Sequence, residues 1–415
     1  MSSAVPTAVP TPVLADYRAV LTAPGALVPV LTSALGRLPT AMIGLALLLY
    51  VADSTGSFAA AGLVNAGGLI GMATGSVVQG RIIDRLGPTR PLLLAAVLFG
   101  AAAAALVLAV EGGRSVPLLM ALALLLGALQ PALPGASRAL WTVLVPAGPR
   151  REAALTYEAI SLEVFFVLGP ALAALLFALG WAGSGLVTAC TAMVAGTVGF
   201  ALSRPVRRGR GGGGGSLGLL GALGRPGMRT VALAALGFGL AVGAVEVGVP
   251  AVTTAGGSAA LGGLLLAGWA CTSVLAGLLY GLRPWPVPLH QRLPALMGAC
   301  GVLVAVMAAT TGVLALFVVA LLAAGTTITA QVTAHSLAVE AAAPPGTATE
   351  AFGWVITAAG VGLAAGQSGA GIAVEAAGPS SAFVVGGAAG VAVAALLWLR
   401  RRTLAPVAAT VPPSG

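Results

Sequence analysis

Residues 61–90 read AGLVNAGGLIGMATGSVVQGRIIDRLGPTR, an uncharged run followed by a short charged loop. The run has the length of about 20 residues that an α-helix needs to cross the hydrocarbon core of a bilayer. The loop holds three arginines and Asp84. The segment therefore predicts a membrane-spanning helix near 58–79 that ends in a polar loop at the membrane surface.

The composition of the whole chain points to the same class of protein. Of its 415 residues, 58% are hydrophobic and 7% are charged, and the mean hydropathy is +1.04. A soluble domain carries about a quarter charged residues, and a disordered chain is poor in hydrophobic ones. Both classes are excluded, which leaves a protein that crosses the membrane many times.

Twelve runs are long and apolar enough to span the bilayer. Because they are apolar all round rather than alternating, we expect an all-α integral membrane fold and not a β-barrel. Their many Gly and Ala residues allow close helix contact in lipid. The predicted spans lie near 26–51, 58–79, 91–110, 117–144, 153–179, 184–202, 230–252, 260–280, 294–310, 312–338, 350–374 and 381–399.

The 20 basic residues, all Arg, indicate the orientation of the spans. With a cytoplasmic N-terminus, 17 of them fall on the cytoplasmic side, Arg114 alone falls outside, and Arg37 and Arg138 lie within spans. Positive residues concentrate in cytoplasmic loops, so we expect both termini in the cytoplasm. The net charge of +9 lies at the span edges and not on one exposed face, which argues against a nucleic-acid partner.

An Arg- and Gly-rich segment divides the spans six and six, and we expect it to be a flexible cytoplasmic linker. A weak repeat favours two related halves, because the Glu-Ala pair at 152–153 recurs at 350–351, and Gly80 has a counterpart in Gly281. The predicted layout is a cytoplasmic N-terminal tail at 1–25, a six-helix half at 26–202, the linker at 203–229, a second six-helix half at 230–399 and a cytoplasmic C-terminal tail at 400–415.

The loop Gly80-Arg-Ile-Ile-Asp84-Arg85-Leu-Gly87-Pro-Thr-Arg90 resembles the signature loop between the second and third helices of the major facilitator superfamily. That signature is a Gly, three residues, an Asp, a basic residue, one residue and a Gly, followed by basic residues. The resemblance implies twelve helices in two pseudo-symmetric halves. It also implies a gating loop of Gly80, Asp84, Arg85, Gly87 and Arg90, in which Asp84 approaches the eleventh helix and favours the outward-facing state.

This contact has a physical basis in the sequence, because a carboxylate is stabilised at the positive N-terminal end of a helix. The eleventh span follows a Pro-Pro-Gly turn, and Thr347 and Glu350 have the spacing of a capping box. We expect Glu350 near Asp84, with Arg81 or Arg85 bridging the two carboxylates. The alternative is that the loop only follows the positive-inside rule.

Two helices resemble those of drug–proton antiporters of the family only in part. Those exporters carry an Arg three residues before a Gln-Gly pair in the fourth helix, where this chain has Gly127 followed by Gln130-Pro131. Of their glycine pattern in the fifth helix, Gly169-Pro170 and two following small residues remain. The stretch that begins at Arg150 is also similar to bacterial transporters called efflux permease-like, which implies a multi-pass protein of the bacterial plasma membrane.

Charged side chains within spans cost at least about 2.5–3.5 kcal/mol each on insertion scales, so they are candidates for function. Arg37 and Glu163 each lie about eleven residues into their predicted spans, near mid-bilayer. The first and fifth helices are neighbours in the resembling family, and we predict an Arg37–Glu163 pair, either structural or exchanged for a proton or cargo. Glu158 lies about 140° away around the helix and is either part of this relay or an interfacial carboxylate.

Glu246 lies in the outer half of the seventh span and has no obvious partner nearby in the sequence. A carboxyl group in a low-dielectric site favours its protonated form, which suits a group that gains and loses a proton in each cycle. The seventh helix lines the central cavity in the resembling family. We predict Glu246 as a proton or cation site; the alternative is a hydrogen-bonded carboxylate at the outer edge.

Four further polar residues are candidates for the cavity or for an inner gate. Gln130 and Gln331 occupy equivalent places in the fourth and tenth spans, and each either binds a polar cargo or hydrogen-bonds a neighbouring helix. Arg138 and His335 lie nearer the cytoplasm and are inner-gate candidates, although a lone His within a span is also frequent as a structural residue.

These patterns together predict a secondary transporter that moves a small amphipathic molecule by alternating access. The chain has no nucleotide-binding loop and no Lys, so the energy is expected from the proton gradient. Apolar cavity helices and the partial fifth-helix pattern favour proton-coupled efflux. The alternatives are an uptake symporter or a uniporter for a sugar or another metabolite, and a transporter-like sensor.

Neither an enzyme nor a metalloprotein is expected. Catalysis needs a cluster such as paired His and Asp, and the chain has only His290 and His335. Cys190, Cys271 and Cys300 lie in apolar runs at spacings that fit neither a metal site nor a disulfide framework. We expect no cofactor, no metal and a monomer in the lipid bilayer.

Overall fold

The computed structural model describes residues 25–209, 220–281, 285 and 287–404. Within these ranges, twelve spans are long and apolar enough to cross a membrane, which confirms the predicted all-α membrane fold. The predicted tails and the middle of the linker (210–219) lie largely outside the described residues, and so do Arg18, Arg210 and Arg283.

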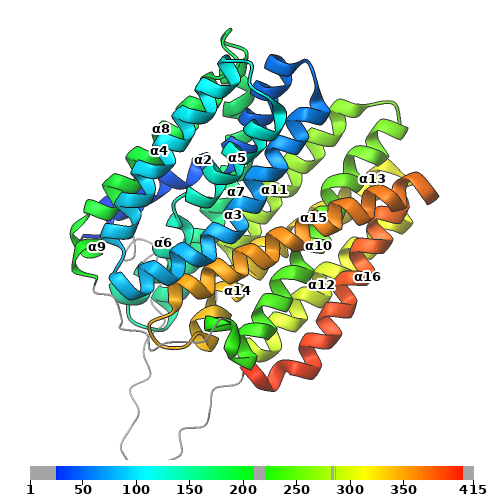
Figure 1. Ribbon diagram of the computed structural model, residues 1–415. Coiled ribbons are helices and arrows are strands. Elements are labelled where there is room, and N and C mark those ends of the chain that lie inside the picture. The colour runs from blue at the N-terminus through cyan, green and yellow to red at the C-terminus, as the bar shows by residue number, and fades with distance from the viewer. Residues whose placement is uncertain (1–24, 210–219, 282–284, 286, 405–415) are drawn as a thin grey trace, which may run out of the picture.

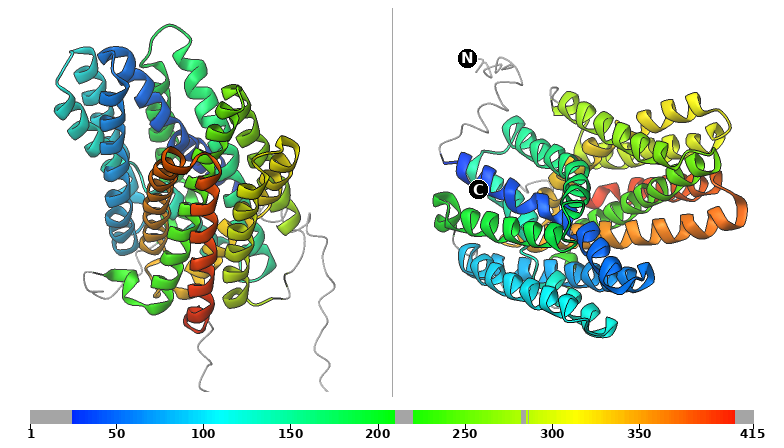
Figure 2. Two further views of the ribbon diagram at one scale, coloured as in Figure 1. Left: turned by 90° about the vertical axis from the view of Figure 1, so that its right-hand side faces the viewer. Right: turned by 90° about the horizontal axis from the view of Figure 1, so that it is seen from above.

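The helices form two bundles that lie side by side (Figure 1; Figure 2, right). The N-terminal bundle consists of α2 (Leu27–Thr55), α3 (Phe58–Leu86), α4 (Thr89–Glu111), α5 (Val116–Leu129), α6 (Leu133–Leu144), α7 (Pro149–Phe177) and α8 (Ser184–Leu202), followed by the short α9 (Arg204–Arg208). The C-terminal bundle consists of α10 (Pro226–Ala255), α11 (Ala259–Gly281), α12 (Leu289–Thr310), α13 (Leu314–Gly325), α14 (Ile328–Ala342), α15 (Ala348–Ala377) and α16 (Ser380–Arg400), with the 3₁₀ turns η1 (Gly221–Gly224) before it and η2 (Arg401–Leu404) after it.

Glycine faces let the helices of one bundle approach closely. In α3, Gly71 and Gly75 lie directly against the backbone of α5, so that a Cβ at either position would overlap carbonyl groups of α5. In α15, Gly362 and Gly366 lie against α10 in the same way. Apolar side chains gain nothing by leaving lipid, so this close van der Waals packing holds the helices together.

The fourth and tenth spans are each broken near their middle. The fourth consists of α5 and α6, and Pro131 lies in the break, where the sequence predicts a kink or a break. The tenth consists of α13 and α14, and its break at Thr326 and Thr327 contains no Pro, so the sequence predicted a continuous helix. The break at Pro131 leaves backbone groups that need partners from neighbouring helices. At the other break, Thr326 and Thr327 donate their backbone N–H groups to the carbonyls of Ala323 and Ala324.

Most arginines gather at one end of the molecule, which we call the Arg-rich end. It comprises the helix ends next to residues 80–90, 145–152, 203–209, 220–229, 288–292, 343–350 and 400–404. The other end, which carries Arg114, is called the opposite end. The two bundles meet chiefly where α3 lies along α15 and where α7 packs on α11 and α14 (Figure 1).

Candidate functional site

The last turn of α3, which extends seven residues beyond the predicted span to Leu86, caps a helix of the other bundle. The carboxylate of Asp84 accepts the backbone N–H groups of Thr349 at 3.0 Å and of Glu350 at 2.7 Å, in the first turn of α15. The first N–H groups of a helix have no partner within the helix, and the helix dipole favours a negative charge there. A residue of the N-terminal bundle therefore serves as the N-terminal cap of a C-terminal helix.

Glu350 lies beside Asp84, and donors from three elements offset the repulsion between the two carboxylates. The Glu350 Oε1 atom accepts three hydrogen bonds. They come from Arg81 Nη2 at 2.8 Å, from the backbone N–H of Ala222 at 3.1 Å and from Trp354 Nε1 at 3.3 Å. Arg81 is thus the arginine that pairs with Glu350 across the bundles.

The predicted capping box is wrong. The hydroxyl of Thr347 donates to the carbonyl of Pro344 at 2.8 Å and makes no cap to α15. The side chain of Glu350 points to Arg81 instead of back to the helix start. The physical reason is that Asp84 already occupies the first-turn N–H groups that Thr347 would have capped.

Two glycines of the loop fit its close contacts. At Gly80 a Cβ would lie 2.8 Å from the Thr349 carbonyl oxygen and from Glu350 Cα, so α15 leaves no room for a side chain. Gly87 ends α3 with a φ of 82°, in the left-handed region that favours glycine. Arg85 and Arg90 lie exposed at the Arg-rich end.

A second set of ion pairs joins the bundles at the Arg-rich end. Glu152, in the first turn of α7, accepts Arg292 Nη1 of α12 at 2.8 Å, and Arg151 pairs with Glu340 of α14. In the weak repeat, Glu152 and Glu350 are equivalent, and each pairs with an Arg of the other bundle. The sequence analysis did not single out Glu152, Arg292 or Glu340, although the repeated Glu-Ala pair was the signal.

The predicted Arg37–Glu163 pair is wrong, because Arg37 pairs with Glu158. The helix α7 begins four residues before the predicted span, so Glu158 is its tenth residue. Arg37 is the eleventh residue of α2, which is nearly the same distance from the helix start. The two therefore lie at equal depth. Glu158 is also not interfacial, because it is 1% exposed. Its carboxylate accepts hydrogen bonds from Ser137 Oγ at 2.8 Å and from Trp141 Nε1 at 2.9 Å.

Arg138 lies one turn beyond Pro134 in α6, buried at the seam between the bundles. Its guanidinium carbon lies 5.7 Å from the ring centroid of Phe352 in α15, which is cation–π distance. Its charge is within electrostatic range of the Arg37–Glu158 pair. Arg138 therefore lies at the contact between the bundles.

Glu163 and Glu246 come from different bundles and lie within electrostatic range of each other. Glu246 of α10 accepts Gln367 Nε2 of α15 at 2.8 Å, a neutral partner that the sequence analysis did not identify. Among the described residues, Glu163 has no hydrogen-bond or ion-pair partner. In the described part of the chain, these two carboxyl groups therefore interact across the boundary of the bundles without a cationic partner.

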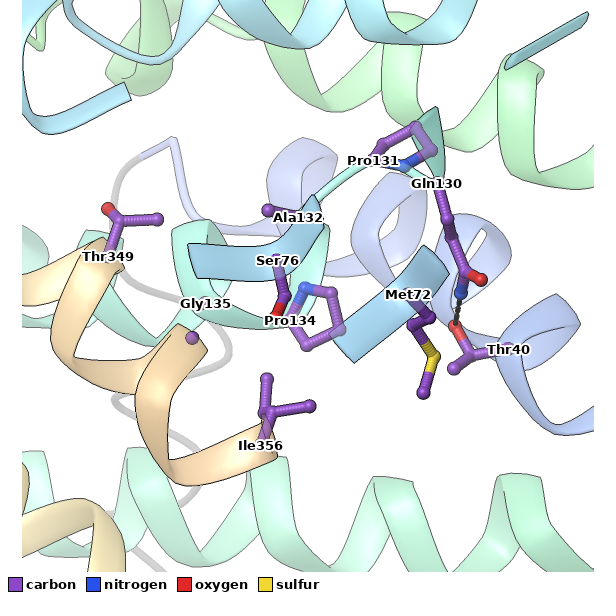
Figure 3. A pocket seen from close by; sticks show the side chains of 11 residues that line it. Thr40, Met72, Ser76, Gln130, Pro131, Ala132, Pro134, Gly135, Thr349 and Ile356 are labelled. Atoms are coloured by element: carbon purple, nitrogen blue, oxygen red, sulfur yellow. Dashed lines mark hydrogen bonds between the residues drawn. The ribbon is translucent and has the colours of Figure 1, made fainter. Parts of the chain in front are cut away.

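A pocket lies between α2, α3, the break of the fourth span and α15 (Figure 3). It holds about 420 Å³ of space, part of it open to the surroundings. The Gln130 side chain lines it and donates to Thr40 Oγ1 at 3.3 Å. The hydroxyl-bearing residues Ser76 and Thr349 complete its polar lining, and neither was predicted.

The side chain of Gln79 hydrogen-bonds the backbone groups that the break leaves without helical partners. This residue was also not predicted. Its Nε2 donates to the carbonyls of Ala128 and Gln130, each at 2.9 Å, and its Oε1 accepts the N–H of Ala132 at 3.2 Å. These three groups lost their helical partners where Pro131 interrupts the helix. Gln79 thus fixes the wall of the pocket.

Gln331 and His335 lie inside the C-terminal bundle and not at the pocket. Gln331 is fully buried, and its Nε2 lies 3.8 Å from Met297 Sδ of α12. His335 Nδ1 lies 2.9 Å from the Gln331 carbonyl, and its ring contacts Phe238 of α10. The repeat equates Gln331 with Gln130, but the two side chains point into different surroundings.

Two six-helix bundles that close against each other through charged residues at one end define a membrane transport protein. Residues 30–342 match the model of the family described as Major Facilitator Superfamily. The chain belongs to this superfamily, whose members are transporters that bind small-molecule substrates in the membrane. No curated protein sequence matches the chain.

Solved structures share the fold at low sequence identity. A bacterial homologue of the iron transporter ferroportin, in an outward-facing state with soaked iron, has a TM-score of 0.74 at 15% identity over 91% of this chain and 98% of that one. The E. coli fucose:proton symporter FucP gives 0.69 at 16% identity over 94% and 100%. The human organic anion transporter MFSD10 (TETRAN) gives 0.67 at 17% identity over 94% and 99%.

Proposed function

We propose that the protein exports a small amphipathic molecule across the plasma membrane in exchange for protons. The two bundles would rock about the seam and expose the pocket to each side in turn. The observation that carries the proposal is the pair of carboxyl groups, Glu163 and Glu246, which come from different bundles, lie within electrostatic range of each other and have no cationic partner among the described residues.

The positive-inside rule supports a cytoplasmic Arg-rich end. With that orientation, the contacts of Asp84 and Glu152 with the C-terminal bundle close the cytoplasmic side. The state described would then be open toward the outside, ready to release cargo and take up protons. Opening of the cytoplasmic side requires these contacts and the Arg151–Glu340 pair to break.

The carboxyl pair supports proton coupling through simple electrostatics. Two nearby carboxylates repel, and burial disfavours charge, so a proton or a cationic cargo relieves the repulsion between Glu163 and Glu246. Release of that proton on the other side would restore the pair. The apolar helices around the seam suit an amphipathic cargo.

The test uses purified protein in liposomes that contain a pH-sensitive dye, with an imposed proton gradient. A panel of amphipathic drugs, sugars and amino acids is added to the native protein and to Glu163→Gln and Glu246→Gln. Glu375→Gln, whose carboxyl is exposed near the end of α15, is the matched control. We expect some amphipathic compounds to trigger proton flux that is lost in one seam variant and kept in the control.

The panel also separates the alternatives. A sugar or amino acid that moves in the same direction as protons would indicate an uptake symporter. Silence of folded protein across the panel would reject proton antiport of these compounds and favour a uniporter or a transporter-like sensor.

A further inference from the structure

The linker between the bundles begins against the gating loop. Directly after α8, the short helix α9 places Val206, which is 1% exposed, in one apolar cluster with Ile83 and Leu92. Ile83 lies next to Asp84, and Leu92 follows the loop at the start of α4. The first described part of the linker thus belongs to the N-terminal bundle.

The last part of the linker reaches the gate from the other bundle. Ala222 in η1 is fully buried and packs in the core of the C-terminal bundle, while its backbone N–H donates to Glu350 Oε1 at 3.1 Å. Gly221 has a φ of 49°, and a Cβ there would overlap the Glu350 carboxylate and approach Arg81 Nη2 to 2.5 Å. The turn η1 therefore packs directly against the Arg81–Glu350 pair and leaves no room for a side chain at Gly221.

We infer that η1 is a positioning element of the gate, which holds the Glu350 carboxylate in place for Arg81. This inference rests on the proposed alternating access. Of the three donors to Glu350 Oε1, only Arg81 belongs to the N-terminal bundle. Ala222 and Trp354 stay with the C-terminal bundle when the bundles separate, so they hold the Glu350 carboxylate in the position in which Arg81 binds it.

Preorganisation of this kind lowers the cost of closing the gate. A free Glu side chain loses rotamer freedom when it is ordered into an ion pair. With two donors already in place, that loss has occurred before Arg81 arrives. The strength of closure is therefore set by the linker as well as by the gating loop.

The experiment measures the gate directly by spin-label distances. Ser115→Cys and Ser258→Cys place one label on each bundle at the opposite end, both at exposed positions. Cys271, the exposed native cysteine, is replaced by Ser, and the buried Cys190 and Cys300 are kept. The distance between the labels shortens when the opposite end closes and the Arg-rich end opens.

We expect Gly221→Ala to raise the short-distance population by roughly fivefold, the effect of losing about one hydrogen bond. Gly224→Ala is the control within η1, because a Cβ there meets nothing within 4 Å. Gly56→Ala is the control for backbone strain, because Gly56 also has a positive φ, 67°, and open space around it. Neither control is expected to change the distances.

A double variant tests whether the effect acts through Glu350. In a Glu350→Ala background, Gly221→Ala is expected to add little, because the side chain that it displaces is gone. Trp354→Phe, which removes only the indole N–H donor, is expected to shift the population in the same direction as Gly221→Ala. It replaces Gly221→Ala if that variant does not fold, as judged by gel filtration and thermal melting.

Two results would overturn the inference: an unchanged distance distribution in both Gly221→Ala and Trp354→Phe, or an equal shift with and without Glu350. Arg81→Gln separates this failure from failure of the proposed function. If Arg81→Gln shifts the distances and the η1 variants do not, only the role of the linker is rejected. If no variant shifts them, alternating access is rejected as well.

Discussion

Asp84 joins the two bundles through a single side chain, because its two oxygens cap a helix of the other bundle. In the proposed mechanism, this cap holds the Arg-rich end closed. Replacement of a capping Asp by Ala costs about 1 kcal/mol, whereas Asn is as good a cap. We expect Asp84→Ala to favour opening of the Arg-rich end by roughly fivefold, with Asp84→Asn between it and the native protein because the charge–dipole term is lost. The same spin-label pair measures this order, and equal effects of Ala and Asn would contradict it.

Glu158 and Glu163 of α7 differ in their partners, so we expect the same substitution to affect stability at Glu158 and not at Glu163. Glu158→Gln leaves the buried Arg37 without a counter-charge, and loss of one partner of a buried pair costs about 3–5 kcal/mol. Glu163→Gln breaks no such pair. We therefore expect a clear fall in melting temperature for Glu158→Gln only, measured on purified protein in detergent. Equal melting temperatures of the two variants would reject the Arg37–Glu158 pair.

At the scale of an element, the broken fourth span depends on a side chain from α3. Gln79→Leu leaves the carbonyls of Ala128 and Gln130 and the N–H of Ala132 without their partner. An unsatisfied buried polar group costs about 1–3 kcal/mol. We expect a lower melting temperature for Gln79→Leu than for Gln130→Leu, which removes one long bond to Thr40. The reverse order would show that water, and not Gln79, satisfies the break.

The elements also show what the sequence predicts and what it does not. Spans are predictable because long apolar runs alternate with charged loops. The start of α7 is not, because Arg150, Arg151 and Glu152 look like a loop but form the first helical turn, where Arg151 and Glu152 bind the other bundle. That shift of four residues displaced the predicted partner of Arg37. The role of Gln79 could not be predicted from the sequence around it, because this role depends on a break in another helix.

At the scale of the whole molecule, two of the ion pairs that join the bundles at the Arg-rich end contain glutamates that the internal repeat relates. One is Arg81 with Glu350, and the other is Arg292 with Glu152. Each joins a first-turn glutamate of one bundle to an arginine of the other. In the proposed alternating access, both contacts would break in the same rocking motion and would contribute to one equilibrium between open and closed forms.

This arrangement predicts additivity. The two pairs share no residue, so their effects on the open–closed equilibrium should add in free energy, which means that the shifts in population ratio multiply. We expect Glu350→Gln and Glu152→Gln each to favour opening of the Arg-rich end, and the double variant to show the product of the two ratios. Spin labels at Ser115→Cys and Ser258→Cys measure all four proteins. A double variant no more open than the stronger single variant would mean that one contact alone controls the gate, and that the pseudo-symmetry has no part in closing it.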